Sequence, residues 1–163
     1  MAIGSIHSKN VAFCVHKLPH GAKKTVHSSQ LLIVLNGVVR AHLNGGWRLD
    51  LGPGNLAYVR TGTTVEAPYD DSTILLLMCD PPRRKLLLTD YALRCNGMLV
   101  YDATPPTIVD RHSIIAPLLT PVAVGENGGP AIIVRPGELI ECKQKCIVKP
   151  LEKPSRALVI VEE

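Results

Sequence analysis

The chain contains five cysteines, and two of them, Cys142 and Cys146, have the close spacing of a pair that can ligate zinc. A structural zinc site takes four ligands, commonly from two such pairs or from one pair and two histidines. No second pair lies near this one in the sequence. We therefore interpret both as strand residues that face the same way. An odd number of cysteines without framework spacing predicts reduced thiols.

The six histidines are candidate metal ligands and candidate acid–base groups. Asp110 and His112 are two positions apart, so on a strand they share a face and are candidate metal ligands. A third ligand would have to come from His27 or His42, and the sequence brings neither to a defined place. We interpret Asp110 and His112 as solvent-facing or turn residues, and we expect no metal and no other cofactor.

Motifs for other reactions are absent from the sequence. It has no glycine-rich phosphate loop, no GxSxG, no HExxH and no CxxC. The formal net charge is +4, but the densest basic runs are only Lys23-Lys24 and Arg83–Lys85, and aromatic residues make up 4% of the chain. Nucleic-acid surfaces typically combine a basic stripe with interleaved aromatic residues. We therefore do not expect a nucleic-acid partner.

The elements that must position these side chains are predicted to be β-strands. Short segments rich in Val, Ile and Leu are separated by turn sequences such as PHG, NGG, GPG and PYDD. The best helical spacing, over Arg83–Cys95, is interrupted on its apolar face by Asp90, so a helix is not favoured there.

An internal repeat organises these strands. Asn44-Gly45-Gly46 recurs as Asn127-Gly128-Gly129, an offset of 83 (127 − 44). Without any gap, the same offset places Pro53-Gly54 on Pro136-Gly137. Glycine and proline coincide because each satisfies a special backbone geometry in the turns. We predict an all-β chain of two tandem units, residues 1–92 and 93–163.

The first unit resembles the cupin superfamily. Leu35–Gly37 (LNG) is similar to the turn that closes the first cupin motif, and Leu51–Glu66 (LGPGNLAYVRTGTTVE) is similar to the second motif. The nearest forms are the sensor domains of AraC-type regulators and the sugar-nucleotide 3,4-ketoisomerases, with Gly21 and Gln30 matching the latter. The resemblance implies two cupin-like jelly rolls, or β-barrels, of which the second is degenerate. It does not imply one function, because this fold has many.

The residues that the resemblance implies for metal chemistry are replaced. Metal-binding cupins carry two histidines, a glutamate and a further histidine, and these positions hold Lys24, Val26, Gln30 and Val65 here. An ammonium, an amide and two valines do not form a first coordination shell for iron, zinc or manganese. We therefore assign no catalytic residue in this unit.

The ketoisomerase pattern fails in the same way, because Lys23 and Thr25 stand where that family has its acid–base histidines. The sequence therefore favours a non-catalytic protein over an enzyme. An enzyme of this type, working without metal through His27, Tyr58 or Lys24, stays open as an alternative.

The function that we favour from sequence is a structural or assembly protein. It would act by forming a homo-oligomer or by joining a larger protein assembly, with a decoration or cement protein of a virion as one concrete form. Edge strands such as Ala157–Val161 could pair with a partner.

The second candidate is a small-molecule binding module like the AraC-type sensors. The interior of the first barrel would hold the ligand, since barrel mouths are ordinary ligand sites. The candidate polar contacts are Gln30, Arg40, His42, Tyr58 and Arg60.

The expected location is the cytoplasm, or a virion if the protein is viral. The first ten residues, MAIGSIHSKN, lack the charged start and apolar run of a signal peptide. The longest apolar runs, Leu31–Leu35 and Ile74–Cys79, are too short to span a membrane, so no membrane partner is expected.

Overall fold

The chain divides into two compact all-β units. The computed structural model describes residues 6–7, 12–43, 46–78, 92–95 and 98–162, and every regular element within them is a β-strand. Gly4–Thr89 form one unit, and Asp90–Glu163 belong to the other. The all-β prediction is confirmed. The boundary between residues 92 and 93 stays a prediction, because residues 79–91 are not among those described.

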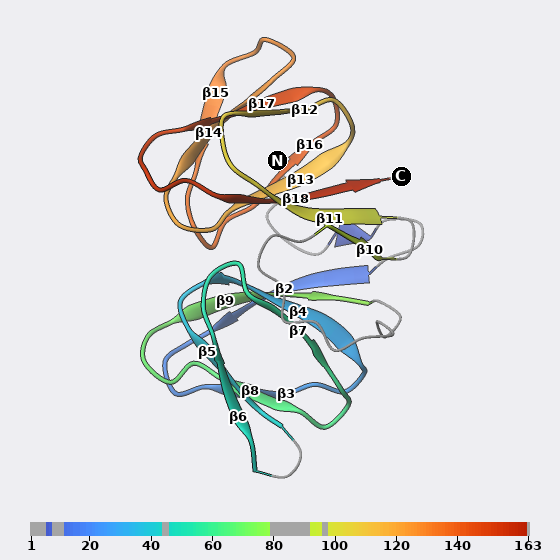
Figure 1. Cartoon of the computed structure of the whole chain (residues 1–163), viewed down its shortest axis with the longest axis vertical. Helices are drawn as coiled ribbons and strands as arrows, with labels where there is room; N and C mark the ends of the chain where they lie inside the picture. Colours follow the sequence, from blue (N-terminus) through green and yellow to red (C-terminus); the bar gives the residue numbers. More distant parts are fainter. Residues whose placement is uncertain (1–5, 8–11, 44–45, 79–91, 96–97, 163) are drawn as a thin grey trace. The chain divides into compact units, whose positions relative to one another are not determined.

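The first unit consists of two antiparallel sheets whose inner faces enclose a core (Figure 1). One sheet has the order β1 (Ile6–His7), β2 (Ala12–Leu18), β9 (Ser72–Leu77), β4 (Gln30–Asn36) and β7 (Leu56–Val59). The other has the order β3 (Lys23–Thr25), β8 (Thr64–Glu66), β5 (Val39–His42) and β6 (Arg48–Leu51).

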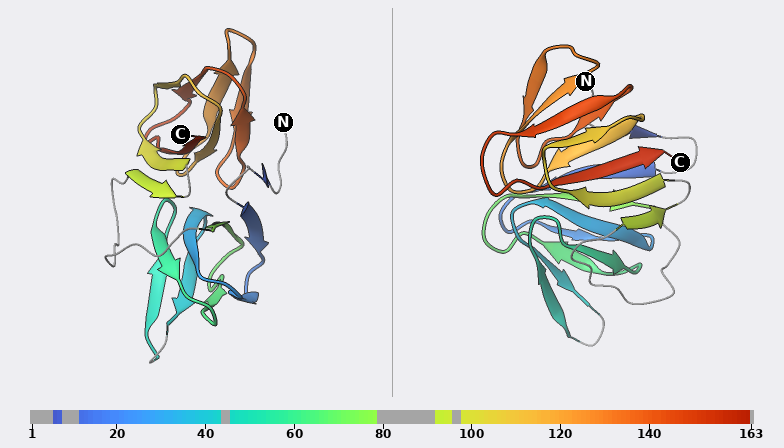
Figure 2. Two further views of the ribbon diagram at one scale, coloured as in Figure 1. Left: turned by 90° about the vertical axis from the view of Figure 1, so that its right-hand side faces the viewer. Right: turned by 45° about the horizontal axis from the view of Figure 1, so that its top comes forward.

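The second unit repeats this arrangement, as Figure 2 shows in two further views. Its five-stranded sheet has the order β10 (Ala92–Cys95), β11 (Met98–Ala103), β18 (Ala157–Glu162), β13 (Ser113–Pro117) and β16 (Ile140–Cys142). Its four-stranded sheet has the order β12 (Thr107–Val109), β17 (Cys146–Pro150), β14 (Val122–Glu126) and β15 (Ala131–Val134). The nine strands of one unit therefore have the connectivity of the nine strands of the other.

The strand registers confirm the internal duplication. Leu32 lies opposite Leu76 in the first unit, and 83 positions further on Ile115 lies opposite Val159. The same offset relates the other pairings among β3–β9 to those among β12–β18. For β2 and β11 the offset is 87 instead, so the second unit is four residues (87 − 83) shorter between its second and third strands.

The shared turns explain why the repeat is visible in sequence. Gly54 and Gly137 both have left-handed backbones, with φ of 83° and 90°, which a side chain would oppose. The residue after each, Asn55 or Glu138, accepts a side-chain hydrogen bond of 2.8 Å from the backbone N–H three positions earlier. Asn44 and Gly45 of the first NGG sequence lie outside the described residues.

Each unit has a core between its own sheets. In the first unit the core residues come from all the larger strands and include Leu32, Val34, Val59, Val65 and Ile74, each 0% exposed. Strands β9 and β13 of the five-stranded sheets are buried on both faces, since every residue of each is buried. This explains why those strands are continuously apolar in sequence instead of alternating.

One local expectation needs correction. Cys142 and Cys146 do not share a strand, because Cys142 ends β16 in the five-stranded sheet and Cys146 begins β17 in the four-stranded sheet. Ala92–Cys95 is strand β10, in agreement with the expectation that a helix is not favoured there, and the earlier part of that segment lies outside the described residues. The described part of the chain contains no helix of the length and apolar character needed to cross a membrane.

Candidate functional site

The five residues predicted to contact a ligand lie on three different surfaces of the first unit. Gln30 lies opposite the core residue Val59, so it faces the barrel interior, and its Nε2 donates to the Ser28 hydroxyl at 2.8 Å. Arg40 and His42 alternate with core residues on β5 and face outward. Tyr58 faces away from the core on β7, and Arg60 is exposed after that strand. This geometry does not support one ligand site shared by all five residues, and their role in ligand binding stays a prediction.

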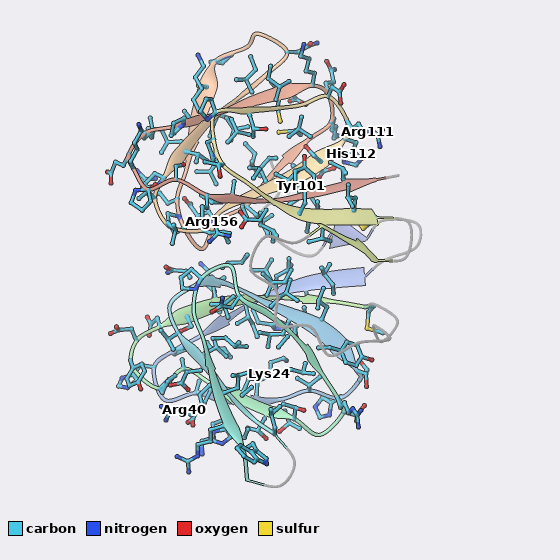
Figure 3. The ribbon with its side chains drawn as sticks, viewed as in Figure 1. Lys24, Arg40, Tyr101, Arg111, His112 and Arg156 are labelled. Atoms are coloured by element: carbon cyan, nitrogen blue, oxygen red, sulfur yellow. The ribbon has the colours of Figure 1, made fainter. Side chains whose placement is uncertain are left out.

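Asp110 and His112 lie in the connection between β12 and β13. Asp110 is exposed, and His112 Nε2 is 2.8 Å from Glu141 Oε1. Within the described ranges no group of three or more His, Cys, Asp or Glu side chains is arranged to hold a metal ion. Figure 3 shows His112 beside Arg111 and Tyr101 at one end of the unit.

The proposed acid–base residues of a ketoisomerase-like enzyme do not converge either. His27 is exposed after β3, and Tyr58 faces the opposite side of its sheet from the core. Of that set only Lys24 faces the interior, because it lies opposite the core residue Val65.

The thiols of Cys142 and Cys146 meet inside the second barrel. Both are buried core residues, and the Ser113 hydroxyl is 4.0 Å from the Cys146 sulfur. Hydrogen bonding from Cys142, and then from Ser113, lowers the pKa of Cys146 to about 7. The same contact raises the pKa of Cys142. The first unit has Val59 and Thr63 at these two positions.

The outer face of the first unit's four-stranded sheet, which we name the polar face, is polar at every position. Its side chains alternate with core residues along β3, β8, β5 and β6. They are Lys23, Thr25, Arg40, His42, Arg48, Asp50, Thr64 and Glu66.

Charged side chains of the polar face satisfy one another. Arg40 donates to both carboxylate oxygens of Asp50, at 2.8 and 3.1 Å, and to the Tyr69 hydroxyl at 3.0 Å. His42 Nε2 is 2.6 Å from Glu66 Oε1. Hydrogen bonds from Arg40 and His42 lower the pKa values of Asp50 and Glu66, respectively. The polar face is therefore suited to contact with solvent.

The equivalent outer face of the second unit, which we name the apolar face, has the opposite character. It consists of Ile108, Ala123, Gly125, Ala131, Ile133, Ile147 and Lys149. Ile108 and Ile147 are direct neighbours on β12 and β17 and are 59% and 38% exposed, and Ile133 on β15 is 52% exposed. Lys149 is the one charged side chain on this described face.

The inner linings differ as well. The first barrel directs His16 and Lys24 inward, opposite the core residues Ile74 and Val65. The equivalent residues of the second barrel are Ala103 and Thr107, by the offsets of 87 and 83. The pKa of His16 is lowered by burial and, secondarily, by the positive charge of Lys24.

Sequence reasoning missed both the apolar face and the His16–Lys24 pair. The signal for the face was present, because the offset of 83 aligns Thr25, Thr64 and Asp50 with Ile108, Ile147 and Ile133. Recognising it requires knowing which face of each strand points outward. The His16–Lys24 pair joins two strands of different sheets, so no spacing in the sequence reveals it.

Comparison with solved structures identifies the fold. AerE from Microcystis aeruginosa aligns over 99% of this chain and 91% of its own, with 11% identity and a TM-score of 0.60. A cupin 2 conserved barrel domain protein from Leptotrichia buccalis aligns over 99% and 89%, with 12% identity and a TM-score of 0.60. Ylba from E. coli aligns over 94% and 77%, with 15% identity and a TM-score of 0.58. No known family model and no curated protein sequence matches the chain.

Proposed function

We propose that this chain, which has a duplicated cupin fold, is a non-catalytic assembly protein whose apolar face binds a second copy of itself. The observation that carries the proposal is the contrast between equivalent positions. Where the polar face has Thr25, Thr64 and Asp50, the apolar face has Ile108, Ile147 and Ile133. Backbone pairing is the same in both sheets, so folding does not require this difference.

The exposed isoleucines provide the driving force. Full burial of one such side chain is worth about 1.5–3 kcal/mol. Gly125 lies between Ile147 and Ala131 across the sheet, so the face has a low centre with large side chains beside it. Exposed apolar side chains that gather on one sheet face, and are not scattered singly, favour use of that face as a contact surface.

A second copy of the chain is the occupant that this surface fits best. An apolar face with a single charged residue is complementary to itself, whereas a face for an acidic partner would need several basic residues. Strand β15, at the edge of the sheet, has no charged residue over Ala131–Val134, and its first three residues are exposed. Unprotected apolar edges of this type favour association with another copy.

The size of the face predicts a weak contact. Four strands about 4.8 Å apart and four residues at about 3.3 Å each give a face of roughly 250 Å². Stable interfaces commonly bury about 800 Å² on each partner. Two copies joined by this face alone therefore dissociate at low concentration, and repetition of the contact in a larger assembly would strengthen it. A decoration protein of a viral shell is one form of such an assembly, and it stays a prediction.

The non-catalytic part of the proposal rests on residue types. Lys24, Val26, Gln30 and Val65 stand where the resemblance implies metal ligands, and His27 and Tyr58 do not join them in the interior.

The test is sedimentation velocity over a range of protein concentrations. Ile147→Glu should weaken self-association about 10- to 100-fold, because it places a carboxylate in the apolar contact. Thr64→Glu, at the equivalent position of the polar face, is the matched control and should leave association unchanged. Equal effects of the two variants, or a wild-type chain that stays monomeric at about millimolar concentration, would contradict the proposal.

The salt dependence of association distinguishes binding to a second copy from binding to an acidic partner. In a contact between two copies, both Lys149 side chains lie on the same interface and repel each other, so added salt should strengthen association. Binding to an acidic partner would weaken with salt. Association of the purified chain that weakens as salt is added would therefore contradict the apolar mode of contact.

A further inference from the structure

The interior of the first barrel contains two basic groups that have no acidic partner among the described residues. His16 on β2 and Lys24 on β3 belong to the two facing sheets, and each lies opposite a core residue of its own sheet. Figure 3 shows Lys24 between the sheets, in contrast to Arg40 on the outside. No carboxylate of the described residues forms an ion pair with either group.

Part of this inner lining is exposed to solvent. Ile74 and Val65, the cross-strand neighbours of His16 and Lys24, are 0% exposed. His16 and Lys24 are only half-buried, as is Gln30 on the same inner lining. In a barrel filled by its own side chains, inward-facing residues in the middle of strands would be buried.

The arrangement is electrostatically unfavourable for the empty protein. A partly desolvated ammonium group disfavours a second positive charge nearby, and burial adds to that cost. Charged groups that are partly removed from water are stabilised by an opposite charge nearby. A bound anion would supply that charge to Lys24 and would let His16 accept a proton.

We propose that His16 and Lys24 bind a small oxoanion inside the first barrel. Lys24 supplies the fixed positive charge and His16 donates a hydrogen bond, with Gln30 lining the same interior. The apolar core residues around these groups fit an anion with a short hydrocarbon part, such as a carboxylate; a phosphate shares the same oxygen chemistry. Of the five residues predicted from sequence, the site includes Gln30 alone. It is independent of the apolar face, which belongs to the other unit.

The shorter second unit supports the assignment. Four residues are missing where its second strand connects to its third, and the equivalents of His16 and Lys24 are Ala103 and Thr107. The second barrel also directs the bulky Tyr101 into its core. The cationic pair therefore belongs to one copy of a common backbone, as expected for a binding group and not for a requirement of the fold.

NMR titration of the full chain at constant ionic strength tests the site, with acetate, hexanoate and phosphate as probes. Saturable shifts of the His16 ring signals are expected. Lys24→Met should weaken binding about tenfold or more, since it removes a charged partner of the anion. Lys23→Met, one position away and on the polar face, is the matched control and should change affinity less than about twofold. Tighter binding of hexanoate than of acetate identifies a carboxylate ligand, and tightest binding of phosphate identifies a phosphate.

A second readout does not depend on choosing the right anion. Lys24→Met should raise the pKa of His16 in the empty protein, and Lys23→Met should not. Saturation with a probe should raise it in the wild-type chain. Absence of saturable binding by all three probes, or a His16 pKa that responds equally to both lysine substitutions, would overturn the proposal. Neither result bears on self-association, which is measured on the other unit.

Discussion

The two units of this chain use the same backbone for different surfaces. The four-stranded sheet of the first unit presents paired charges outward and directs Lys24 inward. The corresponding sheet of the second unit presents Ile108, Ile133 and Ile147 outward and has Thr107 at the inward position. Strand pairing within the two four-stranded sheets differs only by a fixed offset, so backbone geometry does not account for the contrast.

The contrast separates residues that the fold requires from residues that it leaves free. Gly54 and Gly137 coincide because only glycine readily adopts the left-handed turn. Most inward residues coincide in apolar character because both cores must exclude water, and His16 and Lys24 of the first unit are exceptions. Outward residues have no such constraint, and their divergence is where we place function.

The largest predicted effect tests the part that the units share. Leu32 and Ile115 are equivalent core residues, each 0% exposed. Leu32→Ala and Ile115→Ala should each lower the free energy of unfolding by about 2–5 kcal/mol. Urea denaturation followed by residue-specific NMR signals would show whether the loss falls on the substituted unit. A cost below about 1 kcal/mol in only one unit would contradict the equivalence of the two cores.

The next effect concerns the repeated turn. Gly54→Ala and Gly137→Ala place a side chain at φ of 83° and 90°, which costs roughly 1–2 kcal/mol at each position. Thermal unfolding of both variants should give similar losses. Gly125→Ala is a useful comparison, because that glycine has no left-handed backbone and an added Cβ would meet its nearest atom at 3.5 Å. A loss at Gly125 as large as the other two would contradict the backbone explanation.

The smallest effect distinguishes the outer faces by their response to acid. The pKa values of Asp50 and Glu66 are lowered in the folded chain by Arg40 and His42, respectively. Their contribution to stability is therefore present above the unfolded carboxyl pKa of about 4 and is lost as pH falls through the lower folded values. Glu66→Gln should flatten the decline in unfolding free energy between about pH 5 and pH 2.

The matched control for acid sensitivity is Lys149→Gln, because Lys149 occupies the position of Glu66 in the second unit. This variant removes a charge without removing a carboxylate and should retain the acid slope of the wild-type chain. Equal slopes for Glu66→Gln and wild type would show that the His42 contact does not affect stability.

The sequence predicted the class of fold, the duplication and the turns, because glycine and proline report special backbone geometry locally. It did not predict the site to the same degree. The contacts chosen from sequence included Arg40 and His42, which are polar but face outward. The strand containing Lys24 has only three residues, too few for alternation to show which face is buried. The inward direction of Lys24 became clear only from its pairing with the core residue Val65 on the neighbouring strand.

The most direct test of the central claim is a methyl NMR measurement with a soluble paramagnetic agent, at low and high protein concentration. The account predicts that the methyl groups of Ile108, Ile133 and Ile147 become protected from the agent as concentration rises, while those of Thr25 and Thr64 remain accessible. Isoleucine methyl groups that stay equally accessible while the protein associates would contradict the account, because association would then use another surface.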